Sequence, residues 1–262
     1  MLASQVVNPS ALEQFAEYAV SDAMVRNPVI PTRRIRAVLF DVDGTLYRQR
    51  PLRLLMAAEL GALALTQPLR APAIWRTLSA YRKAQESLRG REGAGAARQL
   101  ELAAARARMS TDEVAAIVDV WMIERPLKHL ARCRAHGLVD LLEFLTARRV
   151  QIGILSDYPA QKKIDALGVG HYFSVVLCGG DPEVAAFKPS PRGFLAACGR
   201  WRLDPGDVLY VGDRMDADGA GAAAAKMPAV IVTSEQVHST AGTLAVSSLE
   251  RLRHVLDDNH SR

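Results

Sequence analysis

Two aspartates follow directly after a short apolar run near the start of the chain. Residues Ala37–Phe40 read AVLF, and Asp41 and Asp43 come next, on either side of Val42 and before Gly44. Residues i and i+2 of an extended segment point to the same side, so both carboxylates can face one ligand. One carboxylate of such a pair can act as a nucleophile, and the other can donate or accept a proton. The spacing therefore predicts a catalytic strand end.

Polar groups also follow three apolar runs in the second half of the chain. They are Ser156 with Asp157 after 150–155, Lys188 after 174–177, and Asp213 with Asp216 and Asp218 after 207–211. Ligands of open α/β sheets bind outside the carboxyl ends of the strands. We therefore expect all of these groups to meet the first aspartate pair at one edge of a sheet.

The residue types at this edge indicate what it binds. Several carboxylates would repel each other unless a cation lay among them, and all-oxygen ligands favour a hard ion such as Mg²⁺, which shares its ligand shell with phosphate. Phosphoryl transfer needs positioning and positive charge around the transferring oxygens, which Mg²⁺ and Lys188 would supply. The Ser156 hydroxyl and nearby backbone N–H groups would bind the transferring group. The set predicts a Mg²⁺-dependent phosphoryl-transfer site.

The runs that carry these groups alternate with predicted helices. Helices are expected near 138–148, 160–167, 191–201 and 220–226, and a last apolar strand is expected at 229–232. This alternation is typical of βαβ units and predicts a parallel sheet buried on both faces. Between Arg53 and Leu130, Ala, Leu, Arg and Glu are frequent and β-branched runs are missing. That stretch predicts roughly four helices, one of them starting at a capping box at 110–113.

Four motifs stand in one order at these strand ends: DVDGT at 41–45, Ser156, FKPSP at 187–191 and VGDRMDAD at 211–218. In this order and context, residues 36–235 resemble the haloacid dehalogenase-like (HAD) superfamily. The resemblance implies an α/β fold, namely a Rossmann-like HAD core with a parallel five- to six-stranded sheet and an all-helical cap inserted after the first strand. A cap at that place is similar to the C1 cap of the subfamily I phosphatases.

The domain organisation that follows from this resemblance has three parts. Residues 1–35 are expected to form an N-terminal helical arm and linker, with an amphipathic helix over 10–25. Residues 36–50 and 136–262 are expected to form the HAD core domain. Residues 51–135 are expected to form the helical C1 cap domain, which would decide which leaving group fits the site.

The resemblance also implies a role for each site residue. Asp41 is expected to be the nucleophile and a Mg²⁺ ligand, and Asp43 the general acid/base that gives its backbone carbonyl to the metal. Asp213 and Asp218 are the other expected metal ligands, and Asp216, at a less suitable spacing, ranks below Asp218. The groups expected to bind the substrate phosphoryl group and to fix the loop around it are Gly44, Thr45, Ser156, Asp157 and Lys188.

The leading functional prediction is a Mg²⁺-dependent phosphatase that hydrolyses a small soluble phosphorylated metabolite through an aspartyl-phosphate. A sugar phosphomutase of the β-phosphoglucomutase type keeps the same core residues and stays open as an alternative. A non-catalytic binding or regulatory module of the same fold is the third alternative. Asp43 argues against a dehalogenase, because those relatives typically lack the second acid. The sequence does not name the substrate.

Charge and composition limit the classes of ligand and partner that we expect. The net charge is +5, and residues 48–134 hold 16 Lys and Arg against 8 Asp and Glu, which agrees with an anionic small ligand. No basic block is interleaved with aromatic residues, so nucleic acid is not expected. No apolar stretch reaches the roughly 18–20 residues of a membrane span, and no signal peptide is recognised. Three scattered cysteines suit reduced thiols in the cytoplasm. A homodimer through the arm or the cap stays open.

Apolar residues at helical spacing predict the interior of the cap. Trp75, Leu78, Tyr81 and Leu88 are expected to pack there as one stripe. Tyr47 and Met122 lie near the points where the insertion leaves and rejoins the core, which makes them candidates for lining the mouth of the site.

Overall fold

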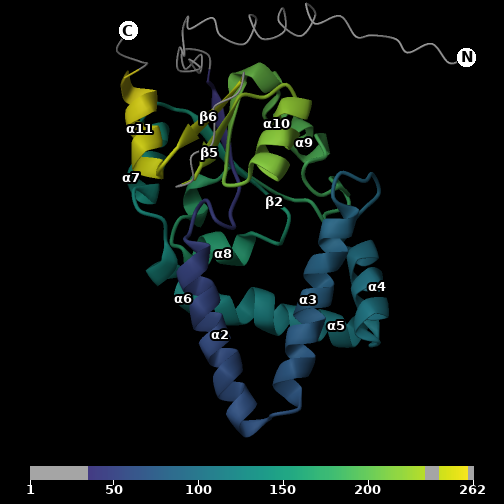
Figure 1. Cartoon of the computed structure of the whole chain (residues 1–262). Coiled ribbons are helices and arrows are strands. Elements are labelled where there is room, and N and C mark those ends of the chain that lie inside the picture. The colour runs from purple at the N-terminus through teal and green to yellow at the C-terminus, as the bar shows by residue number, and fades with distance from the viewer. Residues whose placement is uncertain (1–34, 234–241, 259–262) are drawn as a thin grey trace, which may run out of the picture.

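The computed structural model of the chain describes residues 35–233 and 242–258 (Figure 1). The predicted N-terminal helix over 10–25 lies outside the described residues. Among the described helices, none is both long enough and apolar enough to cross a membrane. The three cysteines of the chain are buried free thiols, as their scattered positions predict.

The described strands form one parallel six-stranded sheet in the order β3-β2-β1-β4-β5-β6. The strands are β1 (Ala37–Phe40), β2 (Gln151–Ser156), β3 (Val175–Cys178), β4 (Val208–Gly212), β5 (Ala229–Val232) and β6 (Thr243–Val246). All four residues of β1 are completely buried, as expected for the centre of a parallel sheet. The predicted α/β fold is confirmed.

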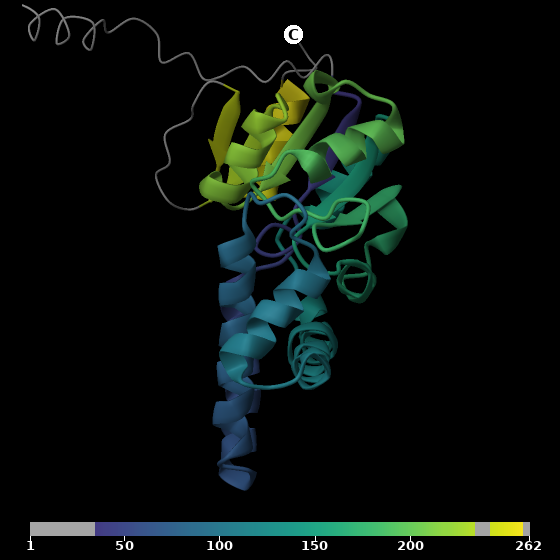
Figure 2. The ribbon, with the colours of Figure 1, turned by 90° about the vertical axis from the view of Figure 1, so that its right-hand side faces the viewer.

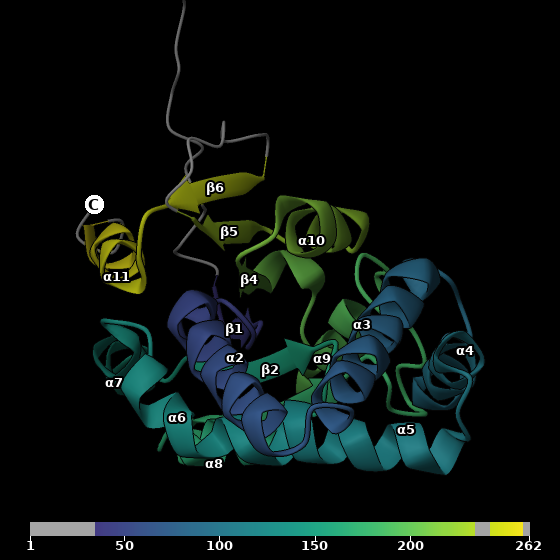
Figure 3. The same cartoon turned by 60° about the horizontal axis from the view of Figure 1, so that its bottom comes forward.

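Helices cover both faces of this sheet (Figure 3). On one face, Val38 and Phe40 pack with α7 (Leu138–Ala147), α8 (Gln161–Ala166) and α11 (Leu249–Asp258). On the other face, Ala37 and Leu39 pack with α9 (Arg192–Trp201) and α10 (Ala220–Ala224). Side chains that alternate along β1 therefore enter two separate apolar clusters, which fixes the strand between the two helical layers.

Every described element between β1 and β2 is helical. The insertion ahead of α7 comprises α2 (Gln49–Thr66), α3 (Arg70–Leu88), α4 (Ala96–Ala107), α5 (Thr111–Val118), the π-helical turn η2 (Asp119–Glu124) and α6 (Arg125–Cys133). These are five α-helices where roughly four were expected, because the π-helical turn η2 separates α5 from α6. In Figure 2 the α2–α3 pair projects away from the sheet.

The helical segment leaves and rejoins the sheet through two adjacent chain segments. Arg48 N–H donates to the Cys133 carbonyl at 2.8 Å, and Ala135 N–H donates to the Leu46 carbonyl at 2.9 Å. These two hydrogen bonds hold the start and the end of the insertion side by side, next to the segment that follows β1. We retain the division into a core and a cap at 51–135 as a proposal.

The apolar stripe expected on α3 is only partly buried. Tyr81 and Leu88 are 7% and 6% exposed, but Trp75 is 62% exposed, so its assignment to the cap interior is wrong. Tyr81 packs against α4 and α5, whereas Trp75 lies in the first half of α3, beyond that cluster. The predicted capping box is present at the start of α5, where Ser110 and Glu113 bond reciprocally.

Candidate active site

The site lies at the carboxyl ends of the central strands. Asp41 follows β1 directly, and its N–H donates to the carbonyl of Val211 in β4 at 2.8 Å. Asp213 follows β4, and Asp218 lies in the π-helical turn η5 (Met215–Gly219) just beyond. The sheet ladder therefore continues one residue past β1 and holds the first aspartate against the neighbouring strand.

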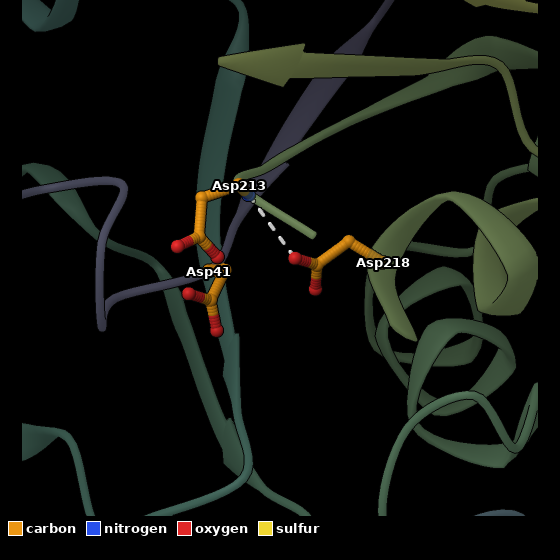
Figure 4. A group of neighbouring side chains, drawn as sticks. All are labelled: Asp41, Asp213 and Asp218. Atoms are coloured by element: carbon orange, nitrogen blue, oxygen red, sulfur yellow. Dashed lines mark hydrogen bonds between the residues drawn. The ribbon is translucent and has the colours of Figure 1, made fainter. Parts of the chain in front are cut away.

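Three carboxylates converge at this point. One oxygen from each of Asp41, Asp213 and Asp218 lies within 4.8 Å of the others, and Figure 4 shows the three side chains gathered at the strand ends. Asp41 and Asp218 are 5% and 1% exposed. The Oδ2 atom of Asp218 accepts the backbone N–H groups of Asp213 at 3.1 Å and Arg214 at 2.9 Å, which fixes its orientation.

Lys188 is the cation of this cluster. Its Nζ lies 2.6 Å from Asp41 Oδ1, 2.6 Å from Asp218 Oδ1 and 3.1 Å from the Tyr210 hydroxyl. Burial alone would lower the pKa of this ammonium, but the Asp218 and Asp41 carboxylates raise it well above its ordinary value. Lys188 is therefore a permanent positive charge between the two acids.

One ammonium does not balance three carboxylates. Burial raises the pKa of Asp213 to about 6, and the Asp218 carboxylate adds to that shift. Burial also raises the pKa of Asp41 despite Lys188, and the nearby carboxylates add to it. Three negative groups and one positive group leave a deficit of two positive charges, and the donors are all oxygen. The residues therefore fit a divalent hard cation such as Mg²⁺.

The loop after β1 can approach this cluster because it carries a glycine. Gly44 has φ +106, and a Cβ atom on it would lie 2.0 Å from Asp213 Oδ2. Any side chain at this position would therefore both strain the backbone and displace a carboxylate of the cluster. Next to it, the buried hydroxyl of Thr45 has no hydrogen-bond partner among the described residues.

Asp43 is held apart from the three-carboxylate cluster by a lysine that the sequence analysis missed. Lys163 Nζ in α8 lies 2.6 and 2.8 Å from the two Asp43 carboxylate oxygens. The Tyr47 hydroxyl donates to the same carboxylate, and Gln49 donates to the Asp43 carbonyl. Burial works to raise the Asp43 pKa, but Lys163 outweighs it and lowers the pKa below its ordinary value. Asp43 is therefore ionised in this arrangement.

The other predicted residues lie around the same strand ends. Ser156 ends β2, is buried, and accepts the N–H of Tyr158 at 3.3 Å. The Oδ1 atom of Asp157 accepts the backbone N–H of Lys188 at 3.0 Å, which ties the loop after β2 to the segment that carries Lys188. Asp216, in contrast, has a 67% exposed side chain and pairs with Arg214 at 3.0 Å, so the geometry favours Asp218 as the metal ligand.

Side chains from α3 close the site from the helical insertion, and these were also missed. A pocket of about 160 Å³ is lined by the acids and by Arg82, Gln85 and Arg89. Gln85 accepts the Tyr158 hydroxyl, and its buried Nε2 has no partner within the described part of the chain. Arg89 pairs with Glu86 at 2.9 Å and lies 3.9 Å from Asp157 and 3.8 Å from the Asp216 carboxylate. The Gln85 amide and the arginines of α3 thus line a pocket of suitable size for a phosphoryl group.

Comparisons with known proteins bear on the family and the fold of the chain. The family model described as a haloacid dehalogenase-like hydrolase matches residues 35–226. A glyceraldehyde 3-phosphate phosphatase of Methanopyrus kandleri is 28% identical over 75% of this chain and 83% of the relative. A phosphoglycolate phosphatase of Escherichia coli is 30% identical over 76% of this chain and 81% of the relative. A 2-haloacid dehalogenase structure from Pseudomonas syringae shares the fold, with a TM-score of 0.60 at 23% identity over 86% and 99% of the two chains.

Proposed function

The chain belongs to the haloacid dehalogenase-like hydrolase family, and from that premise we propose that it is a Mg²⁺-dependent phosphatase that forms an aspartyl-phosphate on Asp41. The observation that carries the proposal is the position of Lys188, which bridges Asp41 and Asp218 at 2.6 Å beside Asp213. Two relatives named as phosphatases, each covered over more than four fifths of its length, support the reaction class.

The first half-reaction is transfer of the phosphoryl group to the protein. A carboxylate oxygen of Asp41 attacks phosphorus, and the bond between phosphorus and the ester oxygen breaks. The leaving alkoxide takes a proton from Asp43, which is ionised in the substrate-free arrangement and therefore has to take up that proton when the substrate binds. Lys188 works against the rise that burial causes in the Asp41 pKa, which favours the ionised nucleophile, and it offers positive charge to the phosphoryl oxygens. Ser156, Thr45 and the Gly44 loop are the groups that we assign to binding of the transferring group.

The second half-reaction returns the nucleophile. Asp43 takes a proton from a water molecule, that water attacks phosphorus, and the bond to the Asp41 oxygen breaks to release inorganic phosphate. Its pairing with Lys163 keeps Asp43 ionised, which suits the base that this step requires. The proton that Asp43 gives up in the first step is thus regained from water in the second.

The cation site belongs to the same proposal. Asp41, Asp213, Asp218 and the Asp43 carbonyl would hold Mg²⁺, which when bound supplies positive charge beside the phosphoryl oxygens and offsets the two unbalanced carboxylates. A cytosolic location and a homodimer through the arm or the cap stay predictions.

Phosphate release from a panel of phosphomonoesters tests the proposal. We expect release in Mg²⁺ and a loss of release when the metal is removed with EDTA and restored by added Mg²⁺. Full release in EDTA contradicts the metal assignment. Isomerisation of a sugar phosphate without net release of phosphate would indicate the mutase reaction instead.

A further inference from the structure

A second cavity opens directly from the phosphoryl pocket into the helical insertion. It has a volume of about 360 Å³, against about 160 Å³ for the pocket around the acids. The two share five lining residues, which are Asp43, Gln49, Arg53, Arg82 and Tyr158. Asp43, the proposed proton donor to the leaving group, therefore stands at the boundary between them. A leaving group protonated by Asp43 would lie in the larger cavity.

The wall of this larger cavity is mainly apolar. Its apolar side chains from α2, α3 and the η2 turn include Leu52, Met56, Leu60, Leu78, Trp121 and Met122. Polar side chains of the wall gather at the Asp43 end, where Lys163, Tyr47 and Gln49 all bond to Asp43. Arg53, Arg82 and Tyr158 also line the pocket around the acids, so among the described residues Ser79 is the remaining polar side chain that could bond a sugar hydroxyl or a carboxylate away from that pocket.

A local irregularity of the backbone shapes this wall. Trp121 and Met122 lie in the π-helical turn η2, and such turns occur frequently at functional sites. Trp121 is 7% exposed, and the Arg125 guanidinium lies over its ring, 4.3 Å from the centroid. Trp121 is therefore a packed part of the cavity wall. Trp75 also lines the cavity but is 62% exposed, which places it where the cavity reaches the surface.

We propose that the substrate is a phosphomonoester of an apolar alcohol, whose hydrocarbon part fills this cavity while its phosphate enters the acid pocket. The inference rests on the proposed phosphatase function and names its substrate class. At roughly 30 Å³ for a water-sized group, the cavity accommodates on the order of ten carbon atoms. Arg53 and Arg82, which line both spaces, are placed beside the phosphate end.

A series of n-alkyl phosphates from ethyl to decyl tests the proposal, with phosphoglycolate, glycerol phosphate and glucose 6-phosphate as polar comparisons. Each methylene buried in the cavity should raise kcat/KM about threefold to fourfold until the cavity is full. We expect octyl phosphate to exceed every polar compound. A flat series, or a preference for a polar compound, overturns the apolar substrate class and leaves the phosphatase proposal standing.

Non-hydrolysable alkylphosphonates separate the two levels of the proposal. Octylphosphonate should bind at least tenfold more tightly than methylphosphonate, measured by calorimetry in Mg²⁺. If the phosphonates bind in this order but none of the phosphates releases phosphate, the phosphatase proposal fails and the apolar cavity assignment is supported. Equal binding of both phosphonates overturns the cavity assignment whatever the activity.

Two adjacent alanines of α2 give a matched pair of variants. Ala57 lines the cavity and Ala58 does not, and both residues are exposed. Ala57→Phe should lower kcat/KM for octyl phosphate by about tenfold or more, because the ring occupies space that the chain needs, and should leave ethyl phosphate within about twofold. Ala58→Phe should change neither substrate. Equal effects of the two variants, or an equal loss for both substrates, contradict the proposal.

Discussion

Two charged clusters in this molecule have opposite compositions. In the helical insertion, one carboxylate, Glu59, is surrounded by three basic groups: Arg125 at 2.9 Å, Lys128 at 2.8 Å and His129 at 2.6 Å. At the strand ends, three carboxylates share one ammonium, that of Lys188. In the Glu59 cluster the basic groups offset the one carboxylate. In the strand-end cluster the carboxylates outnumber the ammonium, so negative charge remains uncompensated.

The two compositions shift pKa values in opposite directions. Burial works to raise the Glu59 pKa, but hydrogen bonds from Lys128, His129 and Arg125 lower it to about 2. Burial raises the Asp213 pKa to about 6, and the Asp218 carboxylate adds to that shift. Basic groups of the protein stabilise the ionised form of Glu59, so that carboxylate requires no ligand. The ionised form of Asp213 lacks such compensation, and a bound cation would supply it. The contrast supports the proposal that the strand-end cluster is the functional one.

Substitution of Asp41 should have the largest effect on the strand-end cluster. Asp41→Asn removes the nucleophile but keeps the size of the side chain, so phosphate release should fall by about 10⁴-fold or more. Steady-state release of phosphate in Mg²⁺ measures it, with substrate binding as the control for folding. Full activity in this variant would contradict the assigned mechanism.

Substitution of Lys163 should have the next largest effect, and its neighbour Lys162 provides a matched control. Lys163 is buried against Asp43, whereas Lys162, adjacent in α8, has a 63% exposed side chain and pairs with Glu124 at the surface. Lys163→Met should lower kcat by about 10²-fold, the lower end of general acid–base contributions. It should also move the pH–rate profile to higher pH, because the ammonium lowers the Asp43 pKa and its removal raises it.

The controls for this effect are Lys163→Arg and Lys162→Met. The arginine variant should restore part of the rate and of the profile, and Lys162→Met should leave both unchanged. An unshifted profile in Lys163→Met would mean that Lys163 stabilises the fold without acting on Asp43.

The acids at the strand ends could be predicted because each follows its strand within a few residues. Asp41 and Asp213 come directly after β1 and β4, so the parallel sheet alone brings them together. Lys188 needed the motif around it, and it lies where that motif implies. Strand β6 and helix α11 were not predicted individually, because the chain after 232 carries no site group and only a short apolar run.

Residues contributed by packing between elements could not be predicted in this way. Gln85 and Arg89 reach the site because α3 lies over it, which depends on how the insertion folds back. Lys163 did carry a signal: Ala160, Lys163, Ile164 and Leu167 follow the i, i+3, i+4, i+7 spacing of a buried helical stripe. A lysine within such a stripe indicates a buried partner of opposite charge.

Removal of charge from the strand-end cluster should stabilise the metal-free protein. The Asp213 pKa is raised in the folded state, so metal-free stability falls as pH rises from about 4 through about 6. Asp213→Asn should therefore gain about 2 kcal/mol at pH 7 without metal. It should also lose the stabilisation that Mg²⁺ gives the unaltered protein. Denaturant unfolding with EDTA or Mg²⁺ measures both, and a less stable metal-free variant would be the contrary result.

The Glu59 cluster should show the opposite behaviour and the smallest effect. Its pKa is lowered in the folded state, so its contribution is present above pH about 4.5 and is lost as pH falls towards about 2. Glu59→Gln should cost about 1 kcal/mol at pH 7, with no dependence on Mg²⁺. Unfolding of both proteins from pH 7 to pH 2 should converge at the acid end. A Mg²⁺-dependent difference would break the contrast between the two clusters.

Detection of a phosphoryl group on Asp41 tests the central claim most directly. Rapid acid quench during turnover in Mg²⁺, followed by peptide mass spectrometry, should find an acyl phosphate on the peptide that contains Asp41. The same adduct should be absent in EDTA and in Asp41→Asn. Turnover with no adduct on Asp41, or an adduct on another residue, would contradict the account.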